Sequence, residues 1–396
     1  MAPRSVGGLY FKKMKKSSFK KSVRIVHLWL GMASGIVVFI MAITGCLYAF
    51  QMEIQDLTQE YRHVEAQNTE FLPPSILEKI ARAEVPNKIL HAIQYSEPDK
   101  AAEAIFYSYE PEYYYISYIN PYTGAVQATV DQHSGFFPFI LDGHFNLWLP
   151  HEIGRPIIAS ATLIFIFMLI SGLILWYPKN KKAAKQRFWF RWKDSTKWKR
   201  KNYDFHNITG FYIMMIAMIF ALTGLVWGFD WFASGYYSAM GGEKSLVYED
   251  PVSEKKTDLA LATNPLDKAW LMMREQYPNA KSIEVHPPET AQSSIAANAN
   301  PEDGTYWKID YRYFDQYTLE EKTVEHVWGR FPDATLSDKV MRMNYDIHTG
   351  AILGLPGKIF AFLISLLIAT LPITGFMVWL GRKNKRKKAT LQLIAE

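Results

Sequence analysis

The sequence predicts a mainly α-helical membrane protein, with four transmembrane helices in a parallel internal repeat and two α+β domains placed between them. Three observations lead to this fold class. Four stretches of the 396-residue chain are uncharged and long, basic residues are concentrated in three short segments, and the same residues recur at the same offsets in both halves. Each observation fixes one part of the expected architecture.

The four uncharged stretches contain no Asp, Glu, Lys or Arg and are 28, 23, 25 and 23 residues long. A transmembrane helix needs roughly 20 apolar residues, so each stretch is long enough to cross a bilayer. The sequence therefore argues against a soluble protein. The stretches are residues 25–52, 156–178, 205–229 and 359–381.

Charge is divided unevenly along the chain and sets the expected orientation. Residues 1–24, 179–203 and 382–396 together hold 25 basic and two acidic residues, whereas the remainder holds 19 basic and 36 acidic ones. Basic residues beside membrane spans stay in the cytoplasm, which places both termini there. We expect these runs to contact anionic lipid rather than nucleic acid.

The spans and the charge distribution together predict the order of segments along the chain. The expected order is a basic cytoplasmic N-terminus at 1–24, a transmembrane helix at 25–52, an outer domain at 53–155, a transmembrane helix at 156–178, a basic cytoplasmic loop at 179–204, a transmembrane helix at 205–229, an outer domain at 230–358, a transmembrane helix at 359–381 and a basic cytoplasmic tail at 382–396.

The spans repeat in pairs. In the first and third spans, a histidine is followed by Gly, by a Thr-Gly pair and by Phe at offsets of 4, 17, 18 and 23 residues. In the second and fourth spans, a glycine is followed by a Ser/Thr-Gly pair and by Trp at offsets of 17, 18 and 22 residues. Both copies begin on the cytoplasmic side, so the repeat is parallel. We interpret the recurring hydroxyl residues as helix-packing positions; they are Thr44, Ser171, Thr223 and Thr374.

The two outer segments mix helical and strand patterns. We expect helices near 73–82 and 265–277, and strands near 105–109, 113–119, 125–130, 306–313 and 321–326. Asn120-Pro121-Tyr122-Thr123-Gly124 is a turn signal, and Asp315-Gln316-Tyr317-Thr318-Leu319 echoes it with leucine in place of glycine. Residues 291–300 are small and polar, which predicts an exposed loop.

Cys46 is the single cysteine, which excludes an intramolecular disulfide and a cysteine metal cluster. The residues that end at Cys46 resemble a bacterial lipoprotein cleavage box. The apolar run before it is longer than that of a signal peptide, and cleavage would remove a span that has a counterpart in the repeat. We therefore expect an uncleaved membrane anchor.

Four histidines stand at the edges of spans, where ionisable residues are uncommon and often functional. His27 and His206 begin the first and third spans, and His144 and His348 precede the second and fourth. Two imidazoles from facing helices can fill both axial positions of a haem iron, which suits electron transfer. The histidines therefore predict one haem site near each membrane face. Three nearby glycines would let a flat macrocycle approach the helices; they are Gly31, Gly35 and Gly210.

Each assignment has an alternative. A histidine at a membrane edge is often only an interfacial side chain, but pairing by repeat and by side favours ligation. His151 competes with His144, because it follows seven residues later on nearly the same helical face; the repeat favours His144. Arg24, Arg155 and Lys358 are candidate partners of haem propionates, with snorkelling to lipid headgroups as the alternative.

At these residues the chain resembles the PepSY-associated transmembrane proteins of bacterial inner membranes. The resemblance rests on His27-Leu28-Trp29-Leu30-Gly31, on residues 142–155, on the stretch from His206 to Gly210, and on Ile347-His348-Thr349-Gly350, and it covers about residues 20–382. The turn at Asn120 resembles the PepSY-domain hairpin. Two positions depart from the pattern: Leu319 in the second turn, and Gly143 before His144, where leucine is usual.

The family includes di-haem siderophore reductases. The resemblance therefore implies two b-type haems, one held by His27 with His206 and one by His144 with His348. It implies a bacterial inner-membrane oxidoreductase with two periplasmic PepSY-like domains. Such a protein passes electrons from a cytoplasmic or quinol donor to a ferric siderophore or another iron chelate in the periplasm. It assigns no catalytic residue. A non-enzymatic PepSY-domain sensor or protease regulator is the alternative, and a transporter is disfavoured because the spans lack charged residues.

Overall fold

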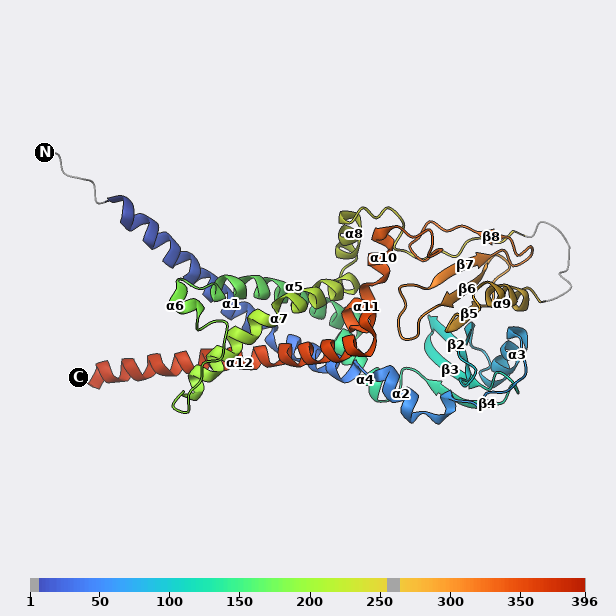
Figure 1. Ribbon diagram of the computed structural model, residues 1–396, viewed down its shortest axis with the longest axis horizontal. Coiled ribbons are helices and arrows are strands. Elements are labelled where there is room, and N and C mark those ends of the chain that lie inside the picture. The colour runs from blue at the N-terminus through green and yellow to red at the C-terminus, as the bar shows by residue number, and fades with distance from the viewer. Residues whose placement is uncertain (1–6, 255–263, 396) are drawn as a thin grey trace. The chain divides into compact units, whose positions relative to one another are not determined.

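The structure is a computed structural model that describes residues 7–254 and 264–395. The chain forms two compact units, one helical and one built on a sheet (Figure 1). The helical unit comprises residues 7–49, 140–232 and 358–395, and the sheet unit comprises the described residues of 50–139 and 233–357. Parts of the predicted N-terminal segment, second outer domain and C-terminal tail, at residues 1–6, 255–263 and 396, lie outside the described residues.

Four long helices form the helical unit, and each is long and apolar enough to cross a membrane. This confirms the four predicted spans, which the helices cover to within four residues at each end. The helices run side by side, and α1 begins and α12 ends at the end of the unit where α6 lies (Figure 1). They are α1 (Gly7–Tyr48), α5 (His151–Trp176), α7 (Trp198–Gly228) and α12 (Gly354–Ala395).

Small and branched apolar side chains from all four helices form the centre of this unit. Large apolar side chains on the outside remain exposed, as expected for a surface in contact with lipid tails; Ile36 is 70% exposed and Met215 is 63% exposed. Two shorter helices complete the unit: α4 (Phe136–Asn146) leads into α5, and α6 (Lys181–Ala184) lies in the basic loop. The central residues are Val38, Ala42, Leu169, Ile213, Ala217, Ile364, Ile368 and Ala369.

The sheet unit contains one eight-stranded antiparallel sheet with the order β4-β3-β2-β1-β5-β6-β7-β8. Strands from both outer segments therefore share a single sheet. They meet where β1 pairs with β5, and Ile93 lies opposite Val285 there. The strands are β1 (Leu90–Tyr95), β2 (Ala102–Tyr109), β3 (Glu112–Ile119), β4 (Val126–Asp131), β5 (Ser282–His286), β6 (Ile295–Asn300), β7 (Asp310–Phe314) and β8 (Glu321–Lys322).

Two helices, α3 (Pro74–Glu84) and α9 (Pro265–Gln276), pack on one face of the sheet and confirm the predicted helices. One hydrophobic core joins both halves; it includes Leu77 of α3 and Met273 of α9, and both are fully buried. The prediction of an exposed loop at 291–300 is wrong over β6. Ala297 and Ala299 are buried there, because their small side chains fit beneath the closely packed helix α9.

The two predicted turns adopt the same conformation. Asn120 Oδ1 accepts hydrogen bonds from the backbone N–H of Tyr122 and of Thr123 at 2.9 and 3.1 Å. Asp315 Oδ1 likewise accepts from the two residues that occupy these positions in the second turn, at 3.0 and 3.2 Å. The second turn thus persists although leucine replaces glycine.

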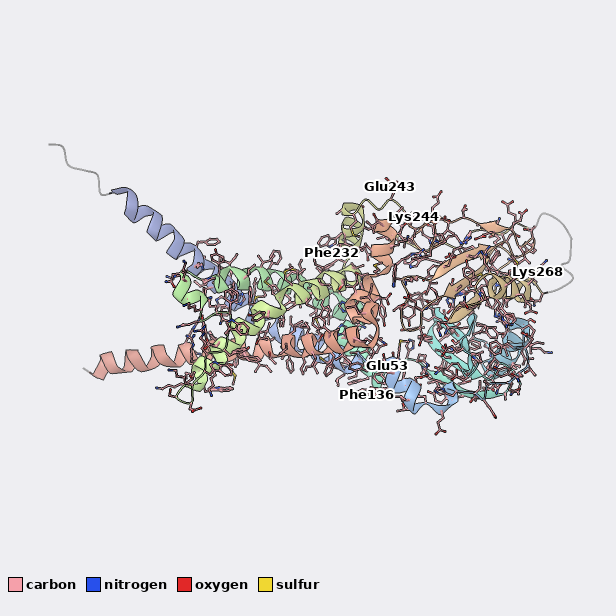
Figure 2. All side chains as sticks on the ribbon, viewed as in Figure 1. Glu53, Phe136, Phe232, Glu243, Lys244 and Lys268 are labelled. Carbon is pink, nitrogen blue, oxygen red and sulfur yellow. The ribbon has the colours of Figure 1, made fainter. Side chains whose placement is uncertain are left out.

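Four further helices belong wholly or mainly to the sheet unit: α2 (Gln51–Thr58), α8 (Asp230–Ala239), α10 (Leu336–Arg342) and α11 (Asn344–Thr349). Asp338 forms a capping box with Thr335, the N-cap of α10, and accepts a hydrogen bond from Tyr237 of α8. Lys244, labelled in Figure 2, pairs with the same carboxylate at 3.1 Å. These contacts anchor α10 beside α8.

Candidate functional site

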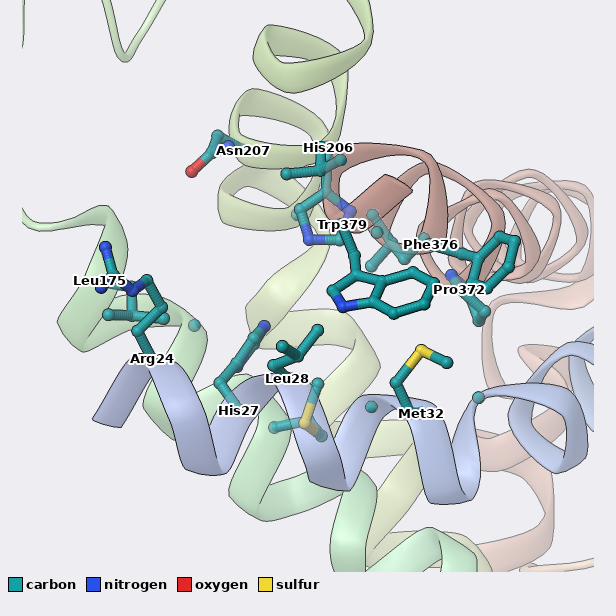
Figure 3. Close-up of a pocket in the computed structure, with 18 of the residues that line it drawn as sticks. Arg24, His27, Leu28, Met32, Leu175, His206, Asn207, Pro372, Phe376 and Trp379 are labelled. Atoms are coloured by element: carbon teal, nitrogen blue, oxygen red, sulfur yellow. The ribbon is translucent and has the colours of Figure 1, made fainter. Parts of the chain in front are cut away.

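A cavity of ≈ 1630 Å³ lies among the four long helices, and it contains the first predicted histidine pair. His27 comes from α1 and His206 from α7. Figure 3 shows their rings directed toward one another across the cavity, with Met32, Phe376 and Trp379 beside them. Two residues 179 positions apart in sequence are thus brought to one site.

Each of these imidazoles is held by a hydroxyl side chain from a neighbouring helix. His27 Nδ1 lies 2.8 Å from Ser171 Oγ of α5, and His206 Nδ1 lies 2.9 Å from Thr374 Oγ1 of α12. Ser171 thus joins α5 to α1 and Thr374 joins α12 to α7, which is compatible with their predicted role in helix packing. The repeat identified these residues, but it gave no signal of which helix each would face.

Glycines form part of the cavity wall. The three glycines predicted to admit a flat macrocycle, Gly31, Gly35 and Gly210, all line the cavity. A Cβ atom at Gly31 would lie 2.8 Å from Met168 Cε, so any larger residue there would displace the side chain that borders the cavity.

Basic side chains gather at one side of the same cavity. Arg24 is among them, and its pairing with a haem propionate stays a prediction. The other two candidates lie elsewhere: Arg155 Nε donates to the Trp227 carbonyl oxygen at 2.9 Å, which joins α5 to the end of α7, and Lys358 is buried in the first turns of α12. The basic residues that line the cavity are Lys20, Lys21, Arg24, Lys179, Arg382 and Lys383.

The second predicted pair is divided between the two units. His144 lies in α4 of the helical unit, and His348 lies in α11 of the sheet unit. His144 Nδ1 is 3.0 Å from the Met41 carbonyl oxygen and 3.2 Å from Thr44 Oγ1, both in α1. Burial lowers the pKa of His144, and the hydrogen bond with the Met41 carbonyl oxygen opposes this effect. The alternative residue, His151, is exposed at the start of α5.

His27 and Thr44, the residue of α1 that contacts His144, lie at opposite ends of one span. Thr44, which contacts His144, follows His27 by 17 residues in α1, which corresponds to about 26 Å along the helix. This distance is close to the roughly 30 Å thickness of a hydrocarbon core. The two positions on α1 are therefore separated by nearly the thickness of such a core.

The residues of the cavity fit a haem. Its volume exceeds the roughly 300–1,000 Å³ of ordinary ligand pockets. Two facing imidazoles supply the donors for an iron, glycines leave room beside them, and basic side chains complement the two propionates. In the described part of the chain, no group of three or more His, Cys, Asp or Glu residues is arranged to hold a bare metal ion.

Sequence reasoning missed one further contact between histidines. His91 of β1 and His286 of β5 lie side by side where the two halves of the sheet meet, with ring centroids 4.8 Å apart. His286 Nε2 also lies 2.7 Å from Glu284 Oε1. Their spacing along the chain gave no sign of this, because β1 and β5 come from different copies of the repeat.

Comparison with known proteins agrees with this architecture. A family model described as the PepSY-associated TM region matches residues 24–382, nearly the whole chain. The matched region contains all four predicted histidines. No curated protein matches the sequence. The extent of the family match shows that the chain belongs to the PepSY-associated TM family.

Proposed function

We propose that the protein is a haem-containing oxidoreductase of the bacterial inner membrane, with both termini in the cytoplasm. It passes electrons across the bilayer to a ferric siderophore or a similar iron chelate on the periplasmic side. One observation carries the proposal: His27 and His206 face one another across a cavity large enough for a porphyrin. A sensor or protease regulator has no need of this arrangement.

The protein's own residues have three roles in this proposal. His27 and His206 would hold one b-type haem near the cytoplasmic face, and a second near the periplasmic face would take His144 and His348 as ligands. Arg24 and its basic neighbours bind carboxylates at the margin of the inner cavity. The apolar helices exclude water. When bound, haem with two imidazole ligands supplies a one-electron ferric/ferrous couple without an open coordination position.

The direction of transfer follows from the acceptor. With haem held at both histidine pairs, an electron from a cytoplasmic or quinol donor would enter at the inner site and leave from the outer one. The chelated iron gains that electron and changes from ferric to ferrous. Ferrous iron is held more weakly by hard oxygen donors, so the chelate releases it.

The first test is a spectrum of the purified protein, oxidised and dithionite-reduced, with a pyridine haemochrome count. Two b-type haems per chain in low-spin form are expected. A colourless protein, even after expression with a haem precursor, would overturn the proposal and favour the sensor or regulator.

Single variants then assign the ligands. His206→Ala should lose the inner haem and keep the outer one, and His144→Ala should do the reverse. His151→Ala is the matched control, because this exposed residue lies seven positions from His144, and it should retain both haems. Retention of both haems in His206→Ala would show that the inner assignment is wrong. Reduction of a ferric siderophore by the dithionite-reduced protein tests the acceptor.

A further inference from the structure

We propose that the Ser/Thr-Gly pair that recurs in the spans is a seat that fixes the tautomer and the orientation of the facing imidazole. Ser171-Gly172 is the seat of His27, and Thr374-Gly375 is the seat of His206. The hydroxyl residues are positioning residues. The inference rests on the proposed haem function and deepens it, because it specifies which nitrogen of each imidazole faces the cavity.

Each hydroxyl donates its proton in a hydrogen bond to a backbone carbonyl oxygen of its own helix. Ser171 Oγ donates to the Met168 carbonyl oxygen at 3.1 Å. Thr374 Oγ1 lies 2.8 Å from the Thr370 carbonyl oxygen and donates to it. A hydroxyl has one proton and two lone pairs. Toward the histidine, each hydroxyl oxygen is therefore the acceptor, and Nδ1 of the imidazole carries the proton.

The contacts of His144 also place the imidazole proton on Nδ1, for an independent reason. Its Nδ1 lies 3.0 Å from the carbonyl oxygen of Met41, which can only accept a hydrogen bond. Nδ1 of His144 is therefore protonated. Thr44 Oγ1, the second neighbour of this nitrogen, donates to the Ile40 carbonyl oxygen at 2.8 Å. The third seat thus has the same proton arrangement as the first two.

The glycine of each pair brings the ring close to the helix. A Cβ atom at Gly172 would lie 3.4 Å from His27 Cε1, and one at Gly375 would lie 3.1 Å from His206 Cε1. The corresponding distance from Gly45 to His144 Cε1 is 3.3 Å. The hydroxyl and the glycine contact adjacent atoms of each ring, Nδ1 and Cε1. Together they set both its position and its rotation.

This seat leaves Nε2 as the nitrogen with a lone pair. The rings of His27 and His206 face the cavity, so each presents a neutral imidazole ready to bind iron without first losing a proton (Figure 3). Hydrogen bonding at the distal nitrogen also makes a histidine ligand more basic. A more basic ligand favours the ferric state, so the seat should lower the reduction potential of the inner site.

Thr374→Val tests the hydroxyl without changing the shape of the side chain. We expect haem at the inner site to bind about 10- to 100-fold more weakly, and its midpoint potential to rise. Thr374→Ser retains the hydroxyl and should behave like the wild type. Thr370→Val is the matched control, because Thr370 lies one turn away on α12 and donates to the Leu367 carbonyl oxygen at 2.6 Å.

The outcomes distinguish a Thr374 hydroxyl that orients the His206 imidazole from one that only packs between helices. If Thr374→Val matched the wild type in haem affinity, potential and low-spin spectrum, the seat would be wrong while the proposed function stood. Loss of haem in the valine variant with retention in the serine variant would support it. A second readout needs no haem: ¹⁵N NMR of histidine-labelled apoprotein should show His206 protonated at Nδ1, assigned by the resonance that His206→Gln removes. Protonation at Nε2 would overturn the inference even if no haem binds.

Discussion

Gly124 and Leu319 occupy the same position in the two matching turns, and both have a positive φ, +74° and +61° respectively. Glycine adopts this conformation without strain, whereas leucine does so only at a cost. Leu319 is 8% exposed and packs into the core shared by both halves of the sheet. Burial of its side chain offsets the unfavourable backbone.

Gly124→Ala should destabilise the protein, because two effects add. The backbone at this position disfavours any side chain, and the new Cβ atom would lie 2.6 Å from Ile80 Cδ1. We expect a loss of about 1–3 kcal/mol in the free energy of unfolding, measured by chemical denaturation in detergent. Gly235→Ala in α8 is the control: no atom lies within 4 Å of its new Cβ, and alanine favours a helix. Equal effects of both substitutions would refute the strain argument.

A charge placed where β1 pairs with β5 should separate the two halves of the sheet. Val285 is fully buried there, so Val285→Asp should reduce the free energy of unfolding by more than about 3 kcal/mol. Val247 is 66% exposed in the same unit, and Val247→Asp should change the free energy of unfolding by less than about 0.5 kcal/mol. Thermal unfolding of the intact protein, followed by circular dichroism, compares the two. A stable Val285→Asp protein would show that the halves fold independently.

The basic margin of the inner cavity should contribute to haem affinity. Arg24→Gln and Arg382→Gln each remove one cation that lines the cavity, and both side chains are exposed. Each should weaken haem binding about two- to fivefold, in a manner that salt suppresses. Lys181→Gln serves as the comparison, since this residue lies in α6 and not in the cavity wall. Absorbance titration of the apoprotein with haem measures the effect, and equal affinities in all three variants would contradict it.

Acid should weaken the anchor between α8 and α10. Burial alone would raise the pKa of Asp338, but hydrogen bonds from Tyr237, the Thr335 backbone and Lys244 outweigh burial and place it below its usual value. A carboxyl group whose pKa is lowered in the folded state stabilises the protein above its unfolded pKa, about 3.9, and loses this contribution as the pH falls through the folded value.

Asp338→Asn should therefore lower the unfolding temperature at pH 7. The difference from the wild type should shrink as the pH falls below about 4, where the carboxylate becomes protonated. Glu320→Gln, at an exposed position of the second turn, should change little at either pH. A pH-independent difference between Asp338→Asn and the wild type would show that the charge is not responsible.

Much of the fold followed from the sequence, because the decisive signals were local. Runs without charge marked the four spans, and the turn motifs marked the hairpins at Asn120 and Asp315. The failures were non-local. The sequence does not predict strand β6, because its alanines have little intrinsic strand preference. They are buried because helix α9, about 20 residues earlier, packs closely above them.

The candidate site could likewise be predicted only in part from the sequence. Equivalent positions in the repeat were enough to pair His27 with His206, and the structure places both at one cavity. The roles of Ser171 and Thr374 were not accessible, because a hydroxyl in an apolar helix looks the same whether it packs or accepts a hydrogen bond. Only the neighbouring helix distinguishes these cases. Arg155 and Lys358 do not line this cavity, and their pairing with a propionate stays a prediction.

Joining both outer segments in one sheet also reduces the number of exposed edge strands through which the protein could associate with other chains. A strand at the edge of a sheet offers unpaired N–H and C=O groups to any passing chain, and so promotes aggregation. Two separate four-stranded sheets would have four such edges, whereas the single sheet formed by residues 7–254 and 264–395 has two, β4 and β8. Strand β8 consists of Glu321 and Lys322 alone, and a short, charged edge discourages further pairing. The fusion of the two copies thus protects a β-rich unit from self-association on a crowded membrane.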